Sequence, residues 1–110
     1  MSANRTYDEI ELGDRASLTR VCTENDLIVF AHASGNLNPL HLPKAGVMPT
    51  EGSETVAPSM WAGSLFSAVL GNVLPGMGTL YRSQLLYFDG RAHVGDELEI
   101  AVTAREKKPD

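Results

Sequence analysis

The feature of the sequence that most constrains the fold is the apolar run at residues 58–73. Drawn as a helix, this run carries large apolar side chains on nearly every face, and its other positions are small. Pro58 suits the first helical position, and Leu74-Pro75-Gly76 ends the run. A helix that is apolar all round in a globular chain is a buried one. We therefore expect a central helix whose small residues, Ser67 among them, let another backbone or a thin ligand approach closely.

The rest of the pattern predicts strands around that helix and one further helix. Thr23 and Asp26 form a capping-box pattern that predicts a helix start, and Ser34-Gly35 predict its end. Alternating apolar and polar residues predict strands at 6–12, 15–22, 79–88, 91–94 and 97–105, and residues 42–58 read as a long loop that holds one short helical turn. We expect a single α+β domain over residues 1–110, with a mainly antiparallel sheet beside the apolar helix.

Composition excludes several classes of function. Apolar residues make up 43% and charged residues 21% of the 110, which is typical of a globular chain. The net charge of −5 argues against a nucleic-acid or membrane partner, because both favour a basic surface. A lone cysteine, Cys22, excludes an internal disulfide and a cysteine-based zinc site, and we expect no metal and no cofactor. The N-terminus lacks the pattern of a signal peptide, so we expect a cytoplasmic protein.

Residues 34–41 are the densest group of polar and turn-forming residues. Asn36 and Asn38 can bond neighbouring backbone groups, and Pro39 fixes the chain before His41. Two polar side chains held five residues apart by a stiffened turn, Asn36 and His41, can point at one small volume, as a water-handling site requires. The alternative is a structural turn that carries a surface histidine.

The sequence resembles the MaoC-like family of (R)-specific hydratases. The family's Asp-x-Asn-Pro-x-His signature stands here as Asn36-Leu37-Asn38-Pro39-Leu40-His41, with Leu74-Pro75-Gly76-x-Gly78 and Val94-Gly95-Asp96 in the expected order behind it. The match covers residues 7 to 108. Ala57-Pro58-Ser59-Met60-Trp61 is most similar to the MaoC-like domain that precedes a phosphotransacetylase domain in some bifunctional bacterial proteins.

The resemblance implies a hot-dog fold, in which a curved antiparallel sheet wraps a central helix. It implies an enoyl-CoA hydratase, a lyase of fatty acid metabolism that adds water to trans-2-enoyl-CoA thioesters as a homodimer. Carried over by position, Asn36 and His41 become the catalytic pair. The substrate-binding positions become Asn38, Ser59, Met60 and Ser67, with backbone N–H groups near Ser59 on the thioester carbonyl and Ser67 in the acyl tunnel.

Two departures from the family pattern open an alternative. Asn36 occupies the position of the catalytic acid, and an amide cannot accept a proton at useful pH. His41 is then the only base in the motif, because imidazole titrates near neutrality. The family domain also continues for about two strands beyond the position of Lys108, so we expect a C-terminally truncated domain with part of the helix exposed. The alternative is therefore a non-catalytic acyl-CoA-binding or dimerisation module of a larger enzyme.

Overall fold

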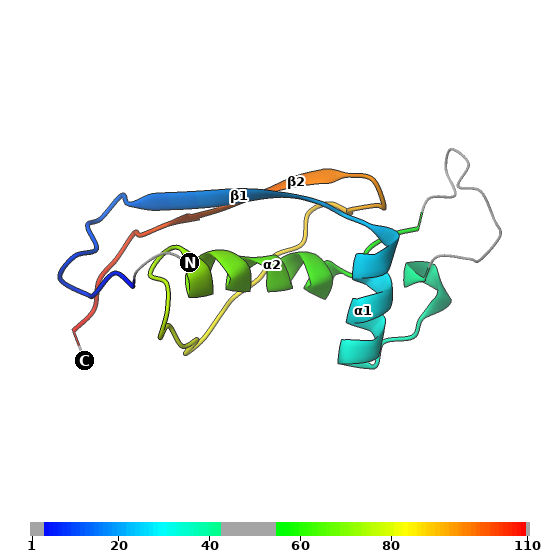
Figure 1. The fold of residues 1–110 in the computed structure, drawn as a ribbon, viewed down its shortest axis with the longest axis horizontal. Helices are drawn as coiled ribbons and strands as arrows, with labels where there is room; N and C mark the ends of the chain where they lie inside the picture. Colours follow the sequence, from blue (N-terminus) through cyan, green and yellow to red (C-terminus); the bar gives the residue numbers. More distant parts are fainter. Residues whose placement is uncertain (1–3, 43–54, 110) are drawn as a thin grey trace. The chain divides into compact units, whose positions relative to one another are not determined.

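The computed structural model describes residues 4–42 and 55–109, and both expected helices are present in it (Figure 1). In chain order the elements are strand β1 (Arg15–Val21), helix α1 (Glu24–Ser34), the short 3₁₀ helix η1 (Pro39–His41), helix α2 (Ser59–Asn72) and strand β2 (Glu97–Thr103).

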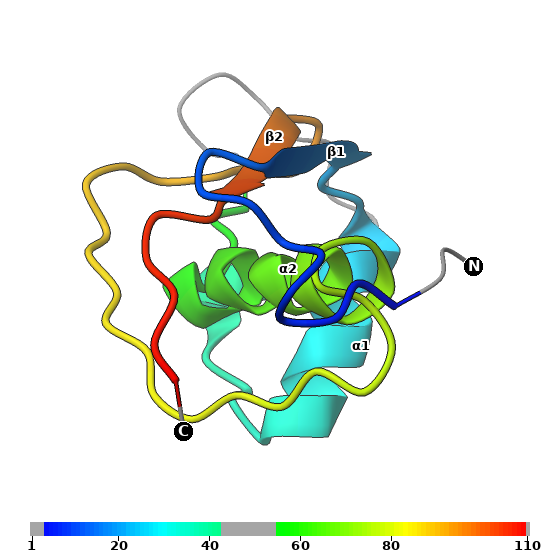
Figure 2. The same cartoon turned by 90° about the vertical axis from the view of Figure 1, so that its left-hand side faces the viewer.

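Strands β1 and β2 form a two-stranded antiparallel sheet (Figure 2). The backbone of Ala104 donates to the carbonyl of Asp14 at 2.8 Å, and the backbone of Cys22 donates to the carbonyl of Asp96 at 2.9 Å. The start of β1 therefore lies beside the end of β2. Ile100 is the buried residue of β2, the strand whose sequence alternates most cleanly. The strands expected at 15–22 and 97–105 are confirmed.

Helix α1 begins and ends as the sequence predicts. Thr23 caps its start, since its side-chain oxygen accepts from the backbone of Asp26 and its own N–H donates to the Asp26 carboxylate. Gly35 closes the helix with φ of 80°, and its N–H donates to the carbonyl of Ala31. The left-handed backbone conformation at this position favours glycine, because a residue with a Cβ would be strained there.

Helix α2 is buried on part of its surface and exposed on the rest. Trp61, Leu65 and Val69 are 4%, 5% and 0% exposed, and their spacing of four places them on one stripe of the helix. Met60 is 56% exposed and Val73 is 38% exposed. The expectation of burial on every face is wrong, because the described residues leave Met60 and Val73 uncovered. The expected partial exposure is what the structure has.

The chain divides into two compact units. One comprises residues 1–19, 64–86 and 99–110, and the other comprises residues 20–63 and 87–98. Three of the four boundaries fall inside β1, α2 and β2, so each of these elements contributes residues to both units.

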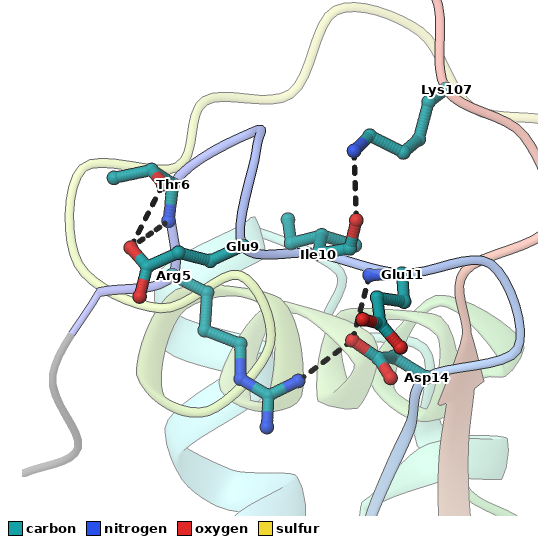
Figure 3. Close-up of polar contacts among 7 residues, drawn as sticks. All are labelled: Arg5, Thr6, Glu9, Ile10, Glu11, Asp14 and Lys107. Carbon is teal, nitrogen blue, oxygen red and sulfur yellow. Dashed lines mark hydrogen bonds and ion pairs between the residues drawn. The ribbon is translucent and has the colours of Figure 1, made fainter.

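The strand expected at 6–12 is absent, and a turn stands in its place. Glu9 accepts hydrogen bonds from the backbone and the hydroxyl of Thr6, at 3.1 and 2.8 Å (Figure 3). Asp14 accepts from the backbone of Glu11 at 2.9 Å. Such local side-chain contacts compete with a strand ladder for the same backbone groups. The loose alternation of this segment therefore predicted the wrong element.

Contacts from the other end of the chain hold this N-terminal segment. The ammonium of Lys107 donates to the carbonyl of Ile10 at 2.8 Å (Figure 3) and lies 4.3 Å from the centre of the Tyr7 ring. Arg5 pairs with Asp14 at 2.9 Å. The first turn is thus fixed by polar contacts rather than by sheet pairing.

The segment expected as a strand at 79–88 is extended in sequence pattern but makes no strand among the described residues. Leu80 and Leu85 are 89% and 77% exposed. The expected short strand at 91–94 contributes one isolated antiparallel bridge, between His93 and Val56. Most of the predicted loop at 42–58, with the short helical turn expected in it, lies outside the described residues.

Candidate active site

The loop after α1 is built by a series of polar side chains, each of which bonds a backbone group two residues further on. The hydroxyl of Ser34 accepts from the N–H of Asn36 at 3.1 Å, the amide oxygen of Asn36 from the N–H of Asn38 at 3.2 Å, and that of Asn38 from the N–H of Leu40 at 3.1 Å. The expected turn-forming role of both asparagines is confirmed. The series leads into η1, where Pro39 occupies the first turn.

These contacts restrict what Asn36 can do. Its side-chain oxygen accepts from the backbone of Asn38, and its NH₂ group donates to none of the described residues. The NH₂ group can hold a water oxygen, and the neutral amide cannot take a proton from it.

His41 is anchored through one ring nitrogen. Nδ1 lies 2.8 Å from the carbonyl oxygen of Val56, and the side chain is half-buried. A carbonyl oxygen only accepts, so Nδ1 carries the hydrogen of this bond. In the neutral ring Nε2 is then the acceptor. The structural turn considered as the alternative is present, and its histidine is half-buried with one ring nitrogen bonded to a backbone carbonyl.

The carbonyl that holds His41 is itself held by a neighbouring segment. Ala57 donates to the carbonyl of Ala92 at 2.8 Å, and Val94 donates to the carbonyl of Thr55 at 3.2 Å. These two bonds flank the bridge between Val56 and His93. In an antiparallel pair of this kind the central residue turns its own N–H and C=O away from the partner strand. The Val56 carbonyl is thereby available to the imidazole.

The turn that follows His93 completes this arrangement. Asp96 accepts from the backbone N–H of His93 at 2.8 Å, and its own N–H donates to the carbonyl of His93 at 3.0 Å. Gly95 has φ of +96°, which a turn of this type requires at its third position. Neither Val56 nor Asp96 was assigned a role from the sequence, although Val94-Gly95-Asp96 was part of the family pattern.

Ser59 and Met60 open helix α2 and are both exposed. The carbonyl of Pro58 accepts from the backbone of Trp61 and Ala62, at 3.0 and 3.5 Å. Residues at a helix start have no intrahelical acceptor for their N–H groups, so those of Ser59 and Met60 can face an oxygen. This agrees with the helix start that the sequence predicted.

One loop carries Asn36, Asn38 and His41, and the same unit contains Ser59 and Met60. Ser67 is exposed on α2 in the other unit, so its place relative to His41 stays a prediction.

The described residues contain no metal site and no membrane-spanning helix. Within residues 4–42 and 55–109, no group of three or more His, Cys, Asp or Glu side chains could hold a metal ion. In that same part of the chain, no helix has the length and apolar character needed to cross a membrane.

Comparison with curated proteins identifies similar sequences along nearly the whole chain. An (R)-specific enoyl-CoA hydratase of Aeromonas caviae is 40% identical over 103 residues, which are 91% of this chain and 77% of that protein. An (R)-specific enoyl-CoA hydratase of Rhodospirillum rubrum is 33% identical over 104 residues, or 94% and 72% of the two chains. A 3-hydroxybutyryl-CoA dehydratase of Methylorubrum extorquens is 33% identical over 94% of this chain and 66% of its own length. No family model matches the chain.

Solved structures give the same result for the fold. An R-hydratase from Pseudomonas aeruginosa superposes with a TM-score of 0.87 at 40% identity, over 96% of this chain and 68% of that one. An (R)-hydratase from Aeromonas caviae superposes with a TM-score of 0.81 at 35% identity, over 92% and 76%. The chain thus spans about two thirds to three quarters of the length of these proteins.

Proposed function

The chain belongs to the MaoC-like family of (R)-specific enoyl-CoA hydratases, which has the hot-dog fold, and we propose that it adds water to trans-2-enoyl-CoA thioesters. In this reaction the water oxygen bonds to the β-carbon and the α-carbon receives a proton. The thioester oxygen gains negative charge on the way. The site must therefore take one proton, deliver one proton and stabilise that oxygen.

His41 is the proposed acid and base. The observation that carries the proposal is the 2.8 Å contact between Nδ1 and the Val56 carbonyl, because it leaves Nε2 as the proton acceptor of the neutral ring. Nε2 takes the proton of the attacking water, and the imidazolium returns a proton to the α-carbon. A ring that is already oriented avoids the cost of ordering it in the transition state.

Asn36 orients the water in this proposal and takes no proton. Its amide oxygen is bonded to the backbone of Asn38, so its NH₂ group is directed to the water oxygen. Loss of one acid–base group typically lowers a rate by roughly 10²–10⁴. We therefore expect hydration slower by about that factor than in a protein with a carboxylate at this position.

The remaining predicted site residues bind the thioester. The backbone N–H groups of Ser59 and Met60 polarise its carbonyl, and Ser67 lines the path of the acyl chain. Asn38 shapes the loop between Asn36 and His41. We further propose a cytoplasmic homodimer of hot-dog domains.

A second candidate is a module that binds acyl-CoA, or only dimerises, without turnover. The observation that favours it is Asn36, since an amide stands where the proposed chemistry would use a carboxylate. The bond from His41 to the Val56 carbonyl favours the hydratase, because it leaves Nε2 of the neutral ring as a proton acceptor.

Hydration of crotonyl-CoA, followed as loss of the conjugated thioester absorbance, separates the two candidates. We expect a slow rate that scales with protein concentration and disappears in His41→Ala. His32→Ala is the matched control, because His32 is exposed on α1. A folded dimer without any rate would favour the non-catalytic module.

Asn36→Asp tests the missing carboxylate. A carboxylate oxygen can still accept from the N–H of Asn38, so the loop should keep its shape while a second oxygen becomes free to take a proton. We expect a rate increase on the order of 10² or more. Asn25→Asp on α1 adds the same charge at an exposed position and should leave the rate unchanged. No gain in a folded Asn36→Asp protein would contradict the assigned role of this position.

A further inference from the structure

Helix α2 and the loop that carries His41 account for the proposed chemistry, but they leave the turn at 93–96 without a role. This turn has three features that bear on His41. It follows the segment paired with Val56, it is closed by a carboxylate, and it contains a glycine at positive φ. All the residues concerned lie in the same unit as His41.

A short series of hydrogen bonds connects the turn to the imidazole of His41. Asp96 Oδ2 accepts from the N–H of His93 at 2.8 Å, which fixes the orientation of the 92–94 backbone. That backbone holds residues 55–57 by two bonds, at 2.8 and 3.2 Å. Residue 56, between the two bonds, presents its carbonyl to Nδ1 of His41 at 2.8 Å.

Backbone hydrogen bonds also attach the turn at 93–96 to Cys22, which follows the end of β1. The N–H of Gly95 donates to the carbonyl of Cys22 at 2.8 Å, and the N–H of Cys22 donates to the carbonyl of Asp96 at 2.9 Å. Cys22 is 1% exposed. The turn is therefore bonded to the buried Cys22 on one side and continues on the other into the backbone that holds the Val56 carbonyl against His41.

We propose that Asp96 is a positioning residue that fixes the tautomer of His41 through the carbonyl of Val56. Asp96 does not touch the imidazole that reacts. It holds the backbone whose carbonyl accepts from Nδ1, and this keeps the hydrogen on Nδ1 and the lone pair on Nε2. When the carbonyl is displaced, the neutral ring can carry its hydrogen on Nε2, and that tautomer cannot accept a proton there. The effect on the tautomer does not depend on the proposed function, whereas the effect on catalysis rests on the proposed role of His41.

The tautomer can be measured without any activity, by ¹⁵N NMR of protein labelled at histidine. The three histidines of the chain are assigned through His32→Gln, His41→Gln and His93→Gln. In the parent protein we expect His41 to have a protonated Nδ1 and an unprotonated Nε2 at a pH where the ring is neutral. A parent His41 with its hydrogen on Nε2 would overturn the proposal before any variant is made.

Asp96→Ala should shift His41 toward a mixture of both tautomers. Asp96→Asn should preserve the parent pattern, because an amide oxygen still accepts from the N–H of His93. Asp89→Ala is the matched control, since Asp89 is exposed in the same unit. If Asp96→Ala does not fold, Gly95→Ala perturbs the same turn through its φ of +96°, with no atom within 4 Å of the added Cβ. An unchanged tautomer in both folded variants overturns the proposal.

Where crotonyl-CoA hydration is present, kcat of Asp96→Ala should fall about tenfold, which corresponds to about 1.4 kcal/mol in the barrier. KM should change less, and Asp96→Asn should restore kcat. If the parent protein has no hydration activity while the tautomer shifts as expected, the hydratase proposal fails and the positioning role of Asp96 stands.

Discussion

Asn36 illustrates how one residue can be understood from its sequence position and still gain a new constraint from structure. The turn-forming role of Asn36 follows from its residue type and from Pro39 close behind it, and the contact with the N–H of Asn38 confirms it. What the sequence does not contain is the direction of the side chain. Only the structure shows that the amide oxygen accepts from the backbone, while the NH₂ group donates to none of the described residues.

Cys22 provides a test of burial at the same scale. Burial, with a smaller contribution from the carboxylates of Asp26 and Asp96, raises the pKa of its thiol from 9.0 to about 11. At pH 8 the folded protein should hold about 100-fold less thiolate than an unfolded chain, so alkylation by iodoacetamide should be slower by at least that factor. Cys22 is the only cysteine, so the reaction reports on it alone.

The pH dependence of the same thiol has a definite sign. A folded-state pKa above the unfolded value means that the thiol's contribution to stability is complete below about pH 9 and is lost as the pH rises toward about 11. Cys22→Ala should show a smaller loss of stability over that range in urea unfolding. Equal alkylation rates for the folded and the unfolded protein at pH 8 would contradict the buried assignment.

At the scale of elements, the sequence predicted those with local signals and missed those that depend on a partner. The capping pattern at Thr23 and the glycine at position 35 define α1, and the clean alternation at 97–105 defines β2. Segments 6–12 and 79–88 alternate as well, but a strand exists only where another strand accepts its backbone bonds. The contact between His41 and Val56 was missed for a related reason, since fifteen residues separate the two in the chain.

Thr23→Ala tests the local signal of α1. The mutation removes the oxygen that accepts from the N–H of Asp26 at 3.1 Å, and loss of such a cap typically lowers the free energy of unfolding by about 1 kcal/mol. Urea unfolding followed by circular dichroism measures the difference. Thr23→Ser keeps an acceptor at the same position and should recover most of the loss. If the alanine and serine proteins have the same stability, the cap contributes nothing to α1.

At the scale of the whole molecule, the chain has the fold of its relatives over about two thirds to three quarters of their length. Helix α2 and the segment at 79–88 both carry apolar side chains that are exposed in the described residues. Leu80, Leu85 and Tyr87 are 89%, 77% and 80% exposed. Exposed apolar side chains on an extended segment favour pairing with another chain.

The proposed dimer predicts that this pairing depends on concentration. In hydrogen exchange, the amides of residues 79–88 should exchange rapidly in dilute protein, because no strand forms there among the described residues, and they should become protected as the concentration rises. Leu85→Lys should abolish the added protection while leaving the free energy of unfolding of the dilute protein within about 0.5 kcal/mol of the parent, because the side chain is already exposed. Val29→Lys, at an exposed position of α1, is the control. Protection at 79–88 that is independent of concentration would mean that the segment is covered within one chain, and the dimer would then have to form through another surface.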